Sequence, residues 1–365
     1  MFSNTRILGL IHLFNYICCT MEKIYTIKDI AKLADVSKGT VDRVLHKRGK
    51  VSQVALDKVN AVLAQIDYQP NLIARNLKNT KIHQISILLP DPKKDAYWQP
   101  CIEGISDAKN EFKAFNINIK TYYFDPTNIQ SFLDTNETLI KDTPDAVLLG
   151  PFFYKESLEV IENYNTLGII SCTFNNHLKS NTIKSFVGQD LFQSGRVAAR
   201  LLDLLIKKGI IAIVHIDEDF KNAVHMQEKE KGFRDYFKSI EDSELNILTY
   251  KLKHPGFKNM LTSIIDKNPS LAGIFVTTSK AYQVAEVTSK INNRKIAIIG
   301  YDLLETNMDY LNKKFIDFLI HQNPKRQAYL GLISLIEYFI FDKEIQSQKL
   351  LPIYIINTEN AKDYL

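Results

Sequence analysis

Side chains that can read DNA bases are concentrated between residues 38 and 46. An arginine such as Arg43 can bind guanine through two hydrogen bonds, and Lys38 and Thr40 can contact base edges or phosphates. Gly39 lets the backbone approach a ligand closely, and His46 ends the same set of outward-facing residues. This combination indicates contact with a DNA groove, provided that one helix carries all of these side chains.

The segment YTIKDIAKLADVSKGTVDRVL, residues 25–45, has the pattern of two short helices that could carry them. Apolar residues recur at three- and four-residue spacing in each half. Thr26 with Asp29 forms a capping-box start for the first helix, and Ser37 can cap the second. Helices joined so tightly share a buried face only by crossing steeply, which predicts a helix-turn-helix. The alternative is a helical pair packed in an unrelated core.

The charge of this region supports the DNA interpretation. Of the net charge of +5, the stretch from Glu22 to Lys81 contributes +6, with twelve basic and six acidic residues. A positive field concentrated on one module favours contact with phosphates. Ser52 can cap a third helix, predicted at residues 53–66, which would close the core of the module.

Residues 71–81 follow, and they predict a short hinge helix. Asn71 can cap it, Leu77 would wedge into the minor groove, and Arg75 and Lys78 would contact the DNA backbone. Two helical turns are marginal in water, so this helix should form only against a partner. The alternative is a linker whose Leu77 packs on a neighbouring domain.

The motifs TIKDIAKLADVSKGTVDRVLHKRG, VS, YQPN and ARNLK, between residues 26 and 78, resemble the DNA-binding module of the LacI/GalR family of bacterial repressors. The resemblance implies base contacts from Lys38, Thr40 and Arg43 and a minor-groove role for Leu77. Asp42 departs from the serine common in the family, which leaves the operator preference open. The predicted DNA-binding residues are Thr26, Ser37, Lys38, Gly39, Thr40, Arg43, His46, Asn71, Arg75, Leu77 and Lys78.

From residue 82 onward, nearly all-apolar strands alternate with amphipathic helices, which predicts parallel sheets covered on both faces. The strand count is too high for one sheet, so we expect two lobes, with a crossover near residues 187–190 and a strand at 315–322 returning to the first lobe. This region resembles the ligand domain of the same family, which is similar to periplasmic sugar-binding proteins. The short motifs that carry the resemblance are VGQD, KGF, IIGYD and HQNP. The expected fold class is an all-α helix-turn-helix head followed by a two-lobed, type I periplasmic-binding-protein-like α/β domain with parallel sheets.

Ligands of parallel α/β sheets bind beyond the carboxyl ends of the strands. The residues that follow the predicted strands mix aromatic rings with amide and acidic groups, which suits a sugar-like polyol. The predicted effector-binding residues are Asp91, Trp98, Phe152, Asn175, Asp190, Lys229, Ser279, Asp302 and Gln322. Trp98 and Phe152 could instead be core residues, and Asp302 could only cap a helix. Lys229 stands where the family usually has arginine, and Ser279 falls in a departure from its usual Asn-Asp pair, so the ligand could differ from a typical sugar.

No nucleotide-binding, metalloprotease or hydrolase motif is present, so no enzyme activity and no cofactor are expected. The acidic turn at residues 217–219 beside His215 could suggest a metal, but such a run is more often a solvated loop, and no metal is predicted. The four cysteines lack metal-ligand spacing, which favours a reducing compartment.

The first twenty residues resemble a short signal-peptide core, but a start at Met21 would make them an artefact, and a DNA reader belongs in the cytoplasm. The expected segments are an N-terminal extension (1–21), a helix-turn-helix domain (22–70), a hinge (71–81) and an effector domain (82–365). Its lobes comprise about 82–187 plus 320–345, and 188–318. We expect a homodimer that represses transcription from a near-palindromic operator, with no membrane partner. The alternatives are an exported sugar receptor and a hydrolase on the same scaffold.

Overall fold

The computed structural model describes residues 25–45, 48–66, 68, 81–217, 222–240, 244–291 and 294–364. The chain divides into two units, Met1–Arg75 and Asn76–Leu365, and each is described by itself. The expectations for residues 1–21 and for the hinge, with the candidates His46, Asn71, Arg75, Leu77 and Lys78, lie outside the described residues. They stay predictions.

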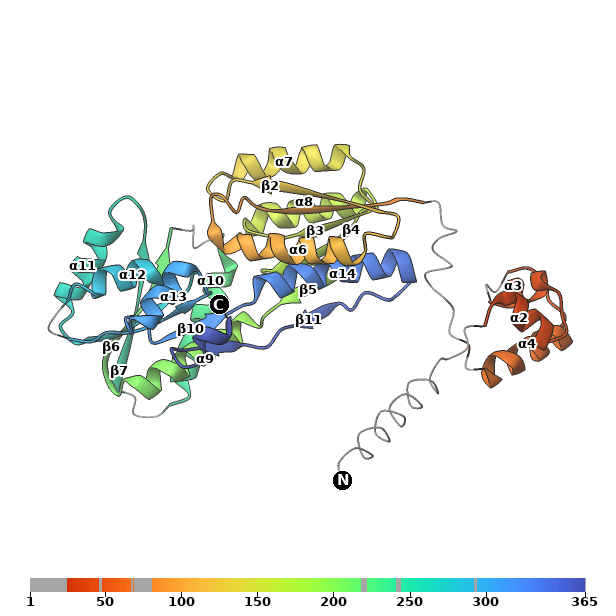
Figure 1. Ribbon diagram of the computed structural model, residues 1–365. Coiled ribbons are helices and arrows are strands. Elements are labelled where there is room, and N and C mark those ends of the chain that lie inside the picture. Colours follow the sequence, from red (N-terminus) through yellow and green to blue (C-terminus); the bar gives the residue numbers. More distant parts are fainter. Residues whose placement is uncertain are drawn as a thin grey trace, which may run out of the picture. The chain divides into compact units, whose positions relative to one another are not determined.

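The first unit contains three helices, α2 (Ile27–Leu33), α3 (Lys38–Leu45) and α4 (Gln53–Gln65) (Figure 1). Each helix contributes fully buried side chains to one small core, among them Ile30, Val41 and Val59. Asp35, in the left-handed region with φ of 54°, makes the tight turn between α2 and α3. The prediction of a helical head is therefore confirmed.

The second unit contains two six-stranded sheets, each of which defines one lobe. Lobe one has the strand order β11-β5-β4-β3-β1-β2 and is entirely parallel. Its strands are β1 (His83–Pro90), β2 (Ile117–Phe124), β3 (Ala146–Leu149), β4 (Ile170–Asn175), β5 (Ser185–Gly188) and β11 (Gln348–Leu350). Its helices are η1 (Ala96–Trp98), α6 (Gln99–Glu111), α7 (Ile129–Lys141), α8 (Tyr154–Thr166) and α14 (Pro324–Phe341).

Lobe two has the order β12-β10-β9-β8-β6-β7, and only β12 runs antiparallel, against β10. Its strands are β6 (Lys208–Ile216), β7 (Glu244–Leu252), β8 (Leu271–Val276), β9 (Ala297–Tyr301), β10 (Phe318–His321) and β12 (Tyr354–Ile356). Its helices are α9 (Leu191–Leu205), α10 (Val224–Lys238), α11 (Phe257–Lys267), α12 (Ala281–Thr288), α13 (Glu305–Asn312) and η2 (Ala361–Tyr364).

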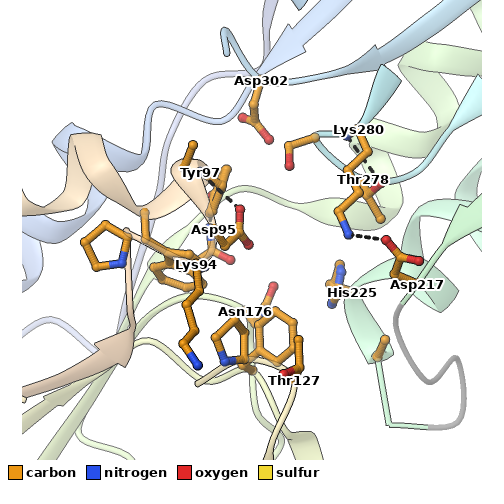
Figure 2. Close-up of a pocket in the computed structure, with 18 of the residues that line it drawn as sticks. Lys94, Asp95, Tyr97, Thr127, Asn176, Asp217, His225, Thr278, Lys280 and Asp302 are labelled. Carbon is orange, nitrogen blue, oxygen red and sulfur yellow. Dashed lines mark hydrogen bonds and ion pairs between the residues drawn. The ribbon is translucent and has the colours of Figure 1, made fainter. Parts of the chain in front are cut away.

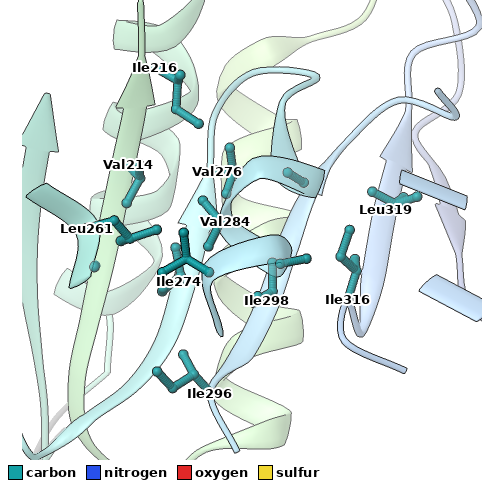
Figure 3. Packing of buried hydrophobic residues seen from close by; sticks show 14 of the residues in the cluster. Val214, Ile216, Leu261, Ile274, Val276, Val284, Ile296, Ile298, Ile316 and Leu319 are labelled. Carbon is teal, nitrogen blue, oxygen red and sulfur yellow. The ribbon is translucent and has the colours of Figure 1, made fainter. Parts of the chain in front are cut away.

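Helices cover both faces of the second sheet, so its central strands carry side chains that are buried on either side. On one face, Val214, Ile274 and Ile298 from three neighbouring strands pack with Leu261 of α11 and Val284 of α12 (Figure 3). This core keeps the strand ends at fixed positions, and those ends carry the site described below.

The chain crosses between the lobes three times, after β5, after β10 and after β11. Gln189, in the first crossing, ties them together because its Nε2 donates to the carbonyl oxygens of His321 (3.0 Å) and Pro352 (2.6 Å). The prediction that residues 315–322 form a strand of the first lobe is wrong. β10 pairs with β9 and β12 in lobe two, and the return to lobe one is made by α14.

Candidate functional site

The outward face of α3 carries the side chains predicted to read DNA. Lys38, Gly39 and Arg43 are exposed, whereas Val41 on the opposite face is fully buried. Ser37 accepts a hydrogen bond from the backbone N–H of Thr40 (3.1 Å), and the two hydroxyls lie 2.9 Å apart. These bonds fix the first turn of α3, so its exposed residues project from a rigid helix.

Thr26, which is exposed, caps the start of α2 as predicted. Its hydroxyl accepts from the backbone N–H of Asp29, while the Asp29 carboxylate accepts from the backbone N–H of Thr26 at 2.9 Å. This is the predicted capping box, which satisfies donors at the start of α2. Its hydroxyl also donates to Asp29, so the side chain is engaged within its own helix start.

The second unit contains a cavity of about 660 Å³ at the carboxyl ends of the strands (Figure 2). Lobe one contributes segments after β1, β2, β3 and β4, and lobe two contributes segments after β6, β7, β8, β9 and β10. We call this cavity the cleft. Its volume lies within the range of about 300–1,000 Å³ that is usual for small-molecule sites.

Four residues at these strand ends have a left-handed backbone: Asn175 (φ 72°), Asp217 (66°), Asp302 (65°) and Asn323 (55°). All but Asn323 line the cleft. Asn and Asp tolerate this conformation better than other side chains with a Cβ, and such residues cluster at functional sites. The sharp turn after each strand places these side chains at the edge of the sheet.

Asp302 lies deepest among the acidic residues of the cleft, with 3% of its surface exposed. Gln322, 6% exposed, donates both its backbone N–H (3.2 Å) and its Nε2 (2.8 Å) to the Asp302 carboxylate. Burial raises the pKa of Asp302 to about 6, although the charge of Lys229 and the bonds from Gln322 oppose this shift. The carboxyl group is therefore a strong acceptor whose protonation changes near neutral pH.

Lys229 is the buried cation of the cleft, with 2% of its surface exposed. It lies on α10, which approaches α9 so closely that only a glycine fits at residue 195. A Cβ on Gly195 would lie 2.0 Å from the Lys229 carbonyl oxygen. Its Nζ donates to the carbonyl oxygen of Thr277 (3.0 Å) and lies 3.6 Å from the centre of the Tyr301 ring. The Thr277 carbonyl oxygen and the Tyr301 ring therefore help to orient the ammonium group.

The aromatic wall comes from lobe one. Trp98 is 2% exposed and packs edge-on against Tyr97 and Phe174, so most of its ring belongs to the core. Its Nε1 nevertheless has no hydrogen-bond partner among the described residues, and Trp98 lines the cleft. Asn175 donates its amide to the Tyr97 hydroxyl, and Phe152 offers a half-buried ring.

The structure brings most of the predicted effector residues together but separates two of them. Those that line the cleft are Trp98, Phe152, Asn175, Lys229, Ser279, Asp302 and Gln322. Asp91 does not line it and accepts from the backbone N–H of Lys93 instead (2.9 Å). Asp190 is exposed and caps α9 by accepting from the backbone N–H of Gln193 (2.9 Å). Both carboxylates stabilise local backbone turns, and we propose neither for the effector.

Sequence reasoning missed several polar residues of the cleft. They include Asp95, Asn222, His225, Lys280 and Tyr282, together with Lys93, Lys94, Asp217 and Lys253. Asp95 lies five residues past the end of β1, and Asn222 and His225 lie six and nine residues past the end of β6. The useful signal would have been the Asn and Asp residues directly after strands, because three of the four with a left-handed backbone line the cleft.

The acidic turn beside His215 is built around an ion pair. Asp217 accepts from Lys280 Nζ and pairs with His254 Nδ1 (2.7 and 2.8 Å). Despite partial burial, which opposes the shift, these partners lower the pKa of Asp217 to about 2. Within the described part of the chain no group of three or more His, Cys, Asp or Glu is placed to hold a metal; residues 218 and 219 lie outside it.

Comparisons with known proteins agree with both halves of this architecture. The family "Bacterial regulatory proteins, lacI family" matches residues 26–71, and the family "Periplasmic binding protein domain" matches residues 85–341. The chain belongs to the LacI family. Its second unit belongs to the periplasmic binding protein domain family, and the chain is a ligand-responsive, DNA-binding transcriptional regulator. The LacI family is regulatory rather than enzymatic.

The relatives of this LacI-family regulator match most of its length. A sucrose operon repressor from Streptococcus mutans is 26% identical over 91% of this chain and 98% of its own length. A ribose operon repressor from Halalkalibacterium halodurans is 26% identical over 76% of this chain and 80% of its own. A crystal structure assigned as a LacI transcriptional regulator from Bacteroides fragilis is 29% identical, with a TM-score of 0.73, covering 78% of this chain and all of that one.

A more distant solved structure shows the fold alone. It is a transporter solute-binding protein from Agrobacterium vitis with bound α-D-tagatopyranose, 20% identical, with a TM-score of 0.67 over 77% of this chain and 96% of that one. In the described part of this chain, no helix combines the length and apolar character needed to span a membrane.

Proposed function

We propose that this regulator is a cytoplasmic repressor that binds a near-palindromic operator as a homodimer and responds to a sugar-like effector in the cleft. The observation that carries the proposal is the presence, in one chain, of an exposed reading helix and a cleft lined by both lobes. A catalytic role is not part of the proposal. The names of the two similar repressors, of a sucrose operon and of a ribose operon, support it.

For DNA, we propose that Lys38, Thr40 and Arg43 contact base edges from α3. Arg43 is exposed and can bind guanine through two hydrogen bonds, while the exposed lysine contacts a base or a phosphate. Two copies would place two such helices in successive major grooves, which explains why a near-palindromic site is expected. The hinge residue Leu77 remains a proposed minor-groove contact, and Arg75 and Lys78 remain proposed contacts to the DNA backbone.

For the effector, we propose a polyol whose hydroxyls donate to Asp302 and accept from the Trp98 Nε1–H. The rings of Phe152 and Tyr282 line the same cleft and can cover apolar C–H faces of a sugar. Buried polar groups without partners are costly, so the unpartnered indole N–H favours a ligand that brings an acceptor.

Binding in the cleft can control DNA affinity because both lobes contribute contacts to one ligand. A ligand that contacts both lobes stabilises one relative arrangement, and the three crossings joined at Gln189 are the place where that arrangement changes. Coupling of this kind amounts to about 1–3 kcal/mol in most allosteric proteins.

The test uses purified full-length protein and fragments of the genome that encodes it. We expect selective retention of a few fragments with two-fold related half-sites, and a sugar that changes their retention about 5- to 150-fold. Equal retention of all fragments, with or without sugars, would refute the proposal. Sedimentation of the complex checks that two chains bind one operator.

A further inference from the structure

We infer that the effector carries an anionic group, a phosphate or a carboxylate, at the end that faces the mouth of the cleft. This inference rests on the proposed function, since it specifies the chemical class of the ligand in the same cleft. It follows from how charge is distributed between the floor and the mouth.

Cations outnumber anions along the cleft. Among the described residues, five lysines line it against three aspartates. The lysines are Lys93 and Lys94 from lobe one and Lys229, Lys253 and Lys280 from lobe two. The aspartates are Asp95, Asp217 and Asp302. A neutral sugar needs no such excess of positive charge, whereas an anion would be attracted by it.

The order of the strands separates these charges along the cleft. In lobe two the strands lie in the order β10, β9, β8, β6, β7. Gln322 and Asp302 follow β10 and β9, at the end next to the crossings. Lys280 follows β8, and Lys253 follows β7 at the far edge. In lobe one, Lys93 and Lys94 follow β1, which lies next to the far edge strand β2. The floor near the crossings therefore carries an acceptor, and the mouth carries lysines from both lobes.

The exposure of these side chains agrees with an acidic floor and a basic mouth. Asp302 is almost completely buried, whereas Lys93, Lys94 and Lys253 are exposed. Figure 2 shows Lys94 and Lys280 on opposite walls of the cleft. A ligand that places hydroxyl donors on Asp302 would present its other end to these lysines.

The lysines of the mouth keep donors available for a ligand. Lys280 pairs with Asp217 and Lys94 with Asp125, but an ammonium has three N–H donors and each of these partners uses only part of them. Neither Lys93 nor Lys253 has an ion-pair partner in the described part of the chain. The four ammonium groups of the mouth, those of Lys93, Lys94, Lys253 and Lys280, therefore face solvent or a ligand.

The same arrangement explains why an anion would act as an effector. The mouth lysines of lobe one and those of lobe two repel each other when the lobes approach, which favours an open cleft. A phosphate or carboxylate between these lysines forms charge-assisted hydrogen bonds with both lobes and removes this repulsion. An anionic polyol would thus stabilise the closed arrangement more than its neutral parent.

The test compares matched neutral and anionic probes by calorimetry and thermal shift on the full-length protein. The panel contains D-ribose with D-ribose 5-phosphate, and D-glucose with D-glucose 6-phosphate and D-gluconate. We expect at least one anionic member to bind about ten-fold more tightly than its parent, with a difference that shrinks from 50 to 300 mM salt because screening weakens it. Comparison of the phosphate with the gluconate identifies which anion is preferred.

Two lysine variants have matched controls. Lys253→Gln and Lys93→Gln should each weaken the anionic ligand about two- to five-fold, and together about ten-fold, without changing affinity for the neutral parent. Lys267→Gln on α11 and Lys141→Gln on α7 remove the same charge from exposed positions outside the cleft and should leave both affinities unchanged.

The outcomes separate the inference from the proposed function. A neutral sugar that binds as tightly as its anionic partner, with no effect of Lys253→Gln, overturns the inference and leaves the sugar effector standing. No binding by any member of the panel, in a protein that still selects its operator, overturns both the anionic group and the sugar-like effector.

Discussion

Gln322 donates its backbone N–H and its side-chain Nε2 to the two carboxylate oxygens of Asp302, at 3.2 and 2.8 Å. Asp302 follows β9, and Gln322 begins the crossing from β10 to α14. The pair therefore joins the floor of the cleft to a segment that connects the lobes. It relates a carboxylate of the cleft to the point at which we propose that the lobes move relative to each other.

Replacing Gln322 with alanine should weaken effector binding by about 1–3 kcal/mol, because it leaves the buried Asp302 carboxylate without its side-chain donor. Calorimetry with the bound sugar measures the loss. Gln346→Ala, an exposed glutamine outside the cleft, is the control and should bind normally. Normal affinity of the Gln322 variant would remove this residue from the site.

Asp302 should make stability depend on pH in a defined window. Its folded pKa of about 6 exceeds the unfolded value of 3.8, so the native state binds more protons between these values and loses stability as pH rises through them. The loss is at most about 3 kcal/mol. Asp302→Asn should abolish it, as measured by denaturant unfolding at pH 4.5, 5.5 and 6.5.

The comparison must use the difference between the two proteins, because His321 acts in the opposite direction. Burial lowers the pKa of His321 to about 4, so its unfolded state binds more protons above that value and stability rises with pH. This contribution is common to both proteins and cancels. A difference that does not change with pH would show that Asp302 stays ionised throughout.

Asn222 should control closure of the cleft. Its Oδ1 accepts from the backbone N–H of Lys155 (3.0 Å) and its Nδ2 donates to the Glu156 carboxylate (2.8 Å), so it links lobe two to the start of α8 in lobe one. Asn222→Ala should weaken effector binding about two- to ten-fold. Asn222→Asp should weaken effector binding further, because its carboxylate would be repelled by Glu156. Small-angle scattering of this variant should show that the two lobes are on average farther apart.

Arg43→Ala should weaken binding to the specific operator by about 1–3 kcal/mol and relax base preference at one position of each half-site. Lys58→Ala on α4 is the control, since it removes one exposed positive charge from the same unit. It should affect specific and random DNA alike. An equal effect of Arg43→Ala on both kinds of DNA would make Arg43 a phosphate contact.

Thr26→Ala should destabilise the start of α2 by about 1 kcal/mol, because it removes the side-chain half of the capping box with Asp29. Hydrogen exchange of the amides of residues 27–33 in the full-length protein measures this locally. Thr26→Ser keeps the hydroxyl and should exchange almost as slowly as the natural protein. Equal protection in all three proteins would mean that packing alone holds the helix.

Regular local patterns were sufficient for many elements. The strands Ile117–Phe124 and Ala146–Leu149 and the helix Ile129–Lys141 belong to the predicted alternation of strands and helices. Each has a clear period or a compact apolar run between turn residues. The caps at Thr26 and Ser52 are also confirmed, because a cap depends on residues within one turn.

Elements without such patterns were missed. α14, the longest described helix, is apolar on most of its surface because it packs against α6 and strands of lobe one, so it shows no single polar stripe. The short strands β11 and β12 have three residues each and exist through pairing with distant strands. Their identity depends on partners more than 30 residues away in the sequence.

By itself, the sequence determined the helix-turn-helix and the alternation of strands and helices, because these depend on neighbours within a few residues. Together with the rule that ligands bind beyond strand ends, it also predicted most of the residues that we propose for the effector. The tertiary structure alone decided that β10 stays in lobe two, that Asp91 and Asp190 cap backbone turns, and that Asp302 meets Gln322. Those outcomes depend on which strands lie side by side and on burial from two directions. No local pattern of residues encodes either one.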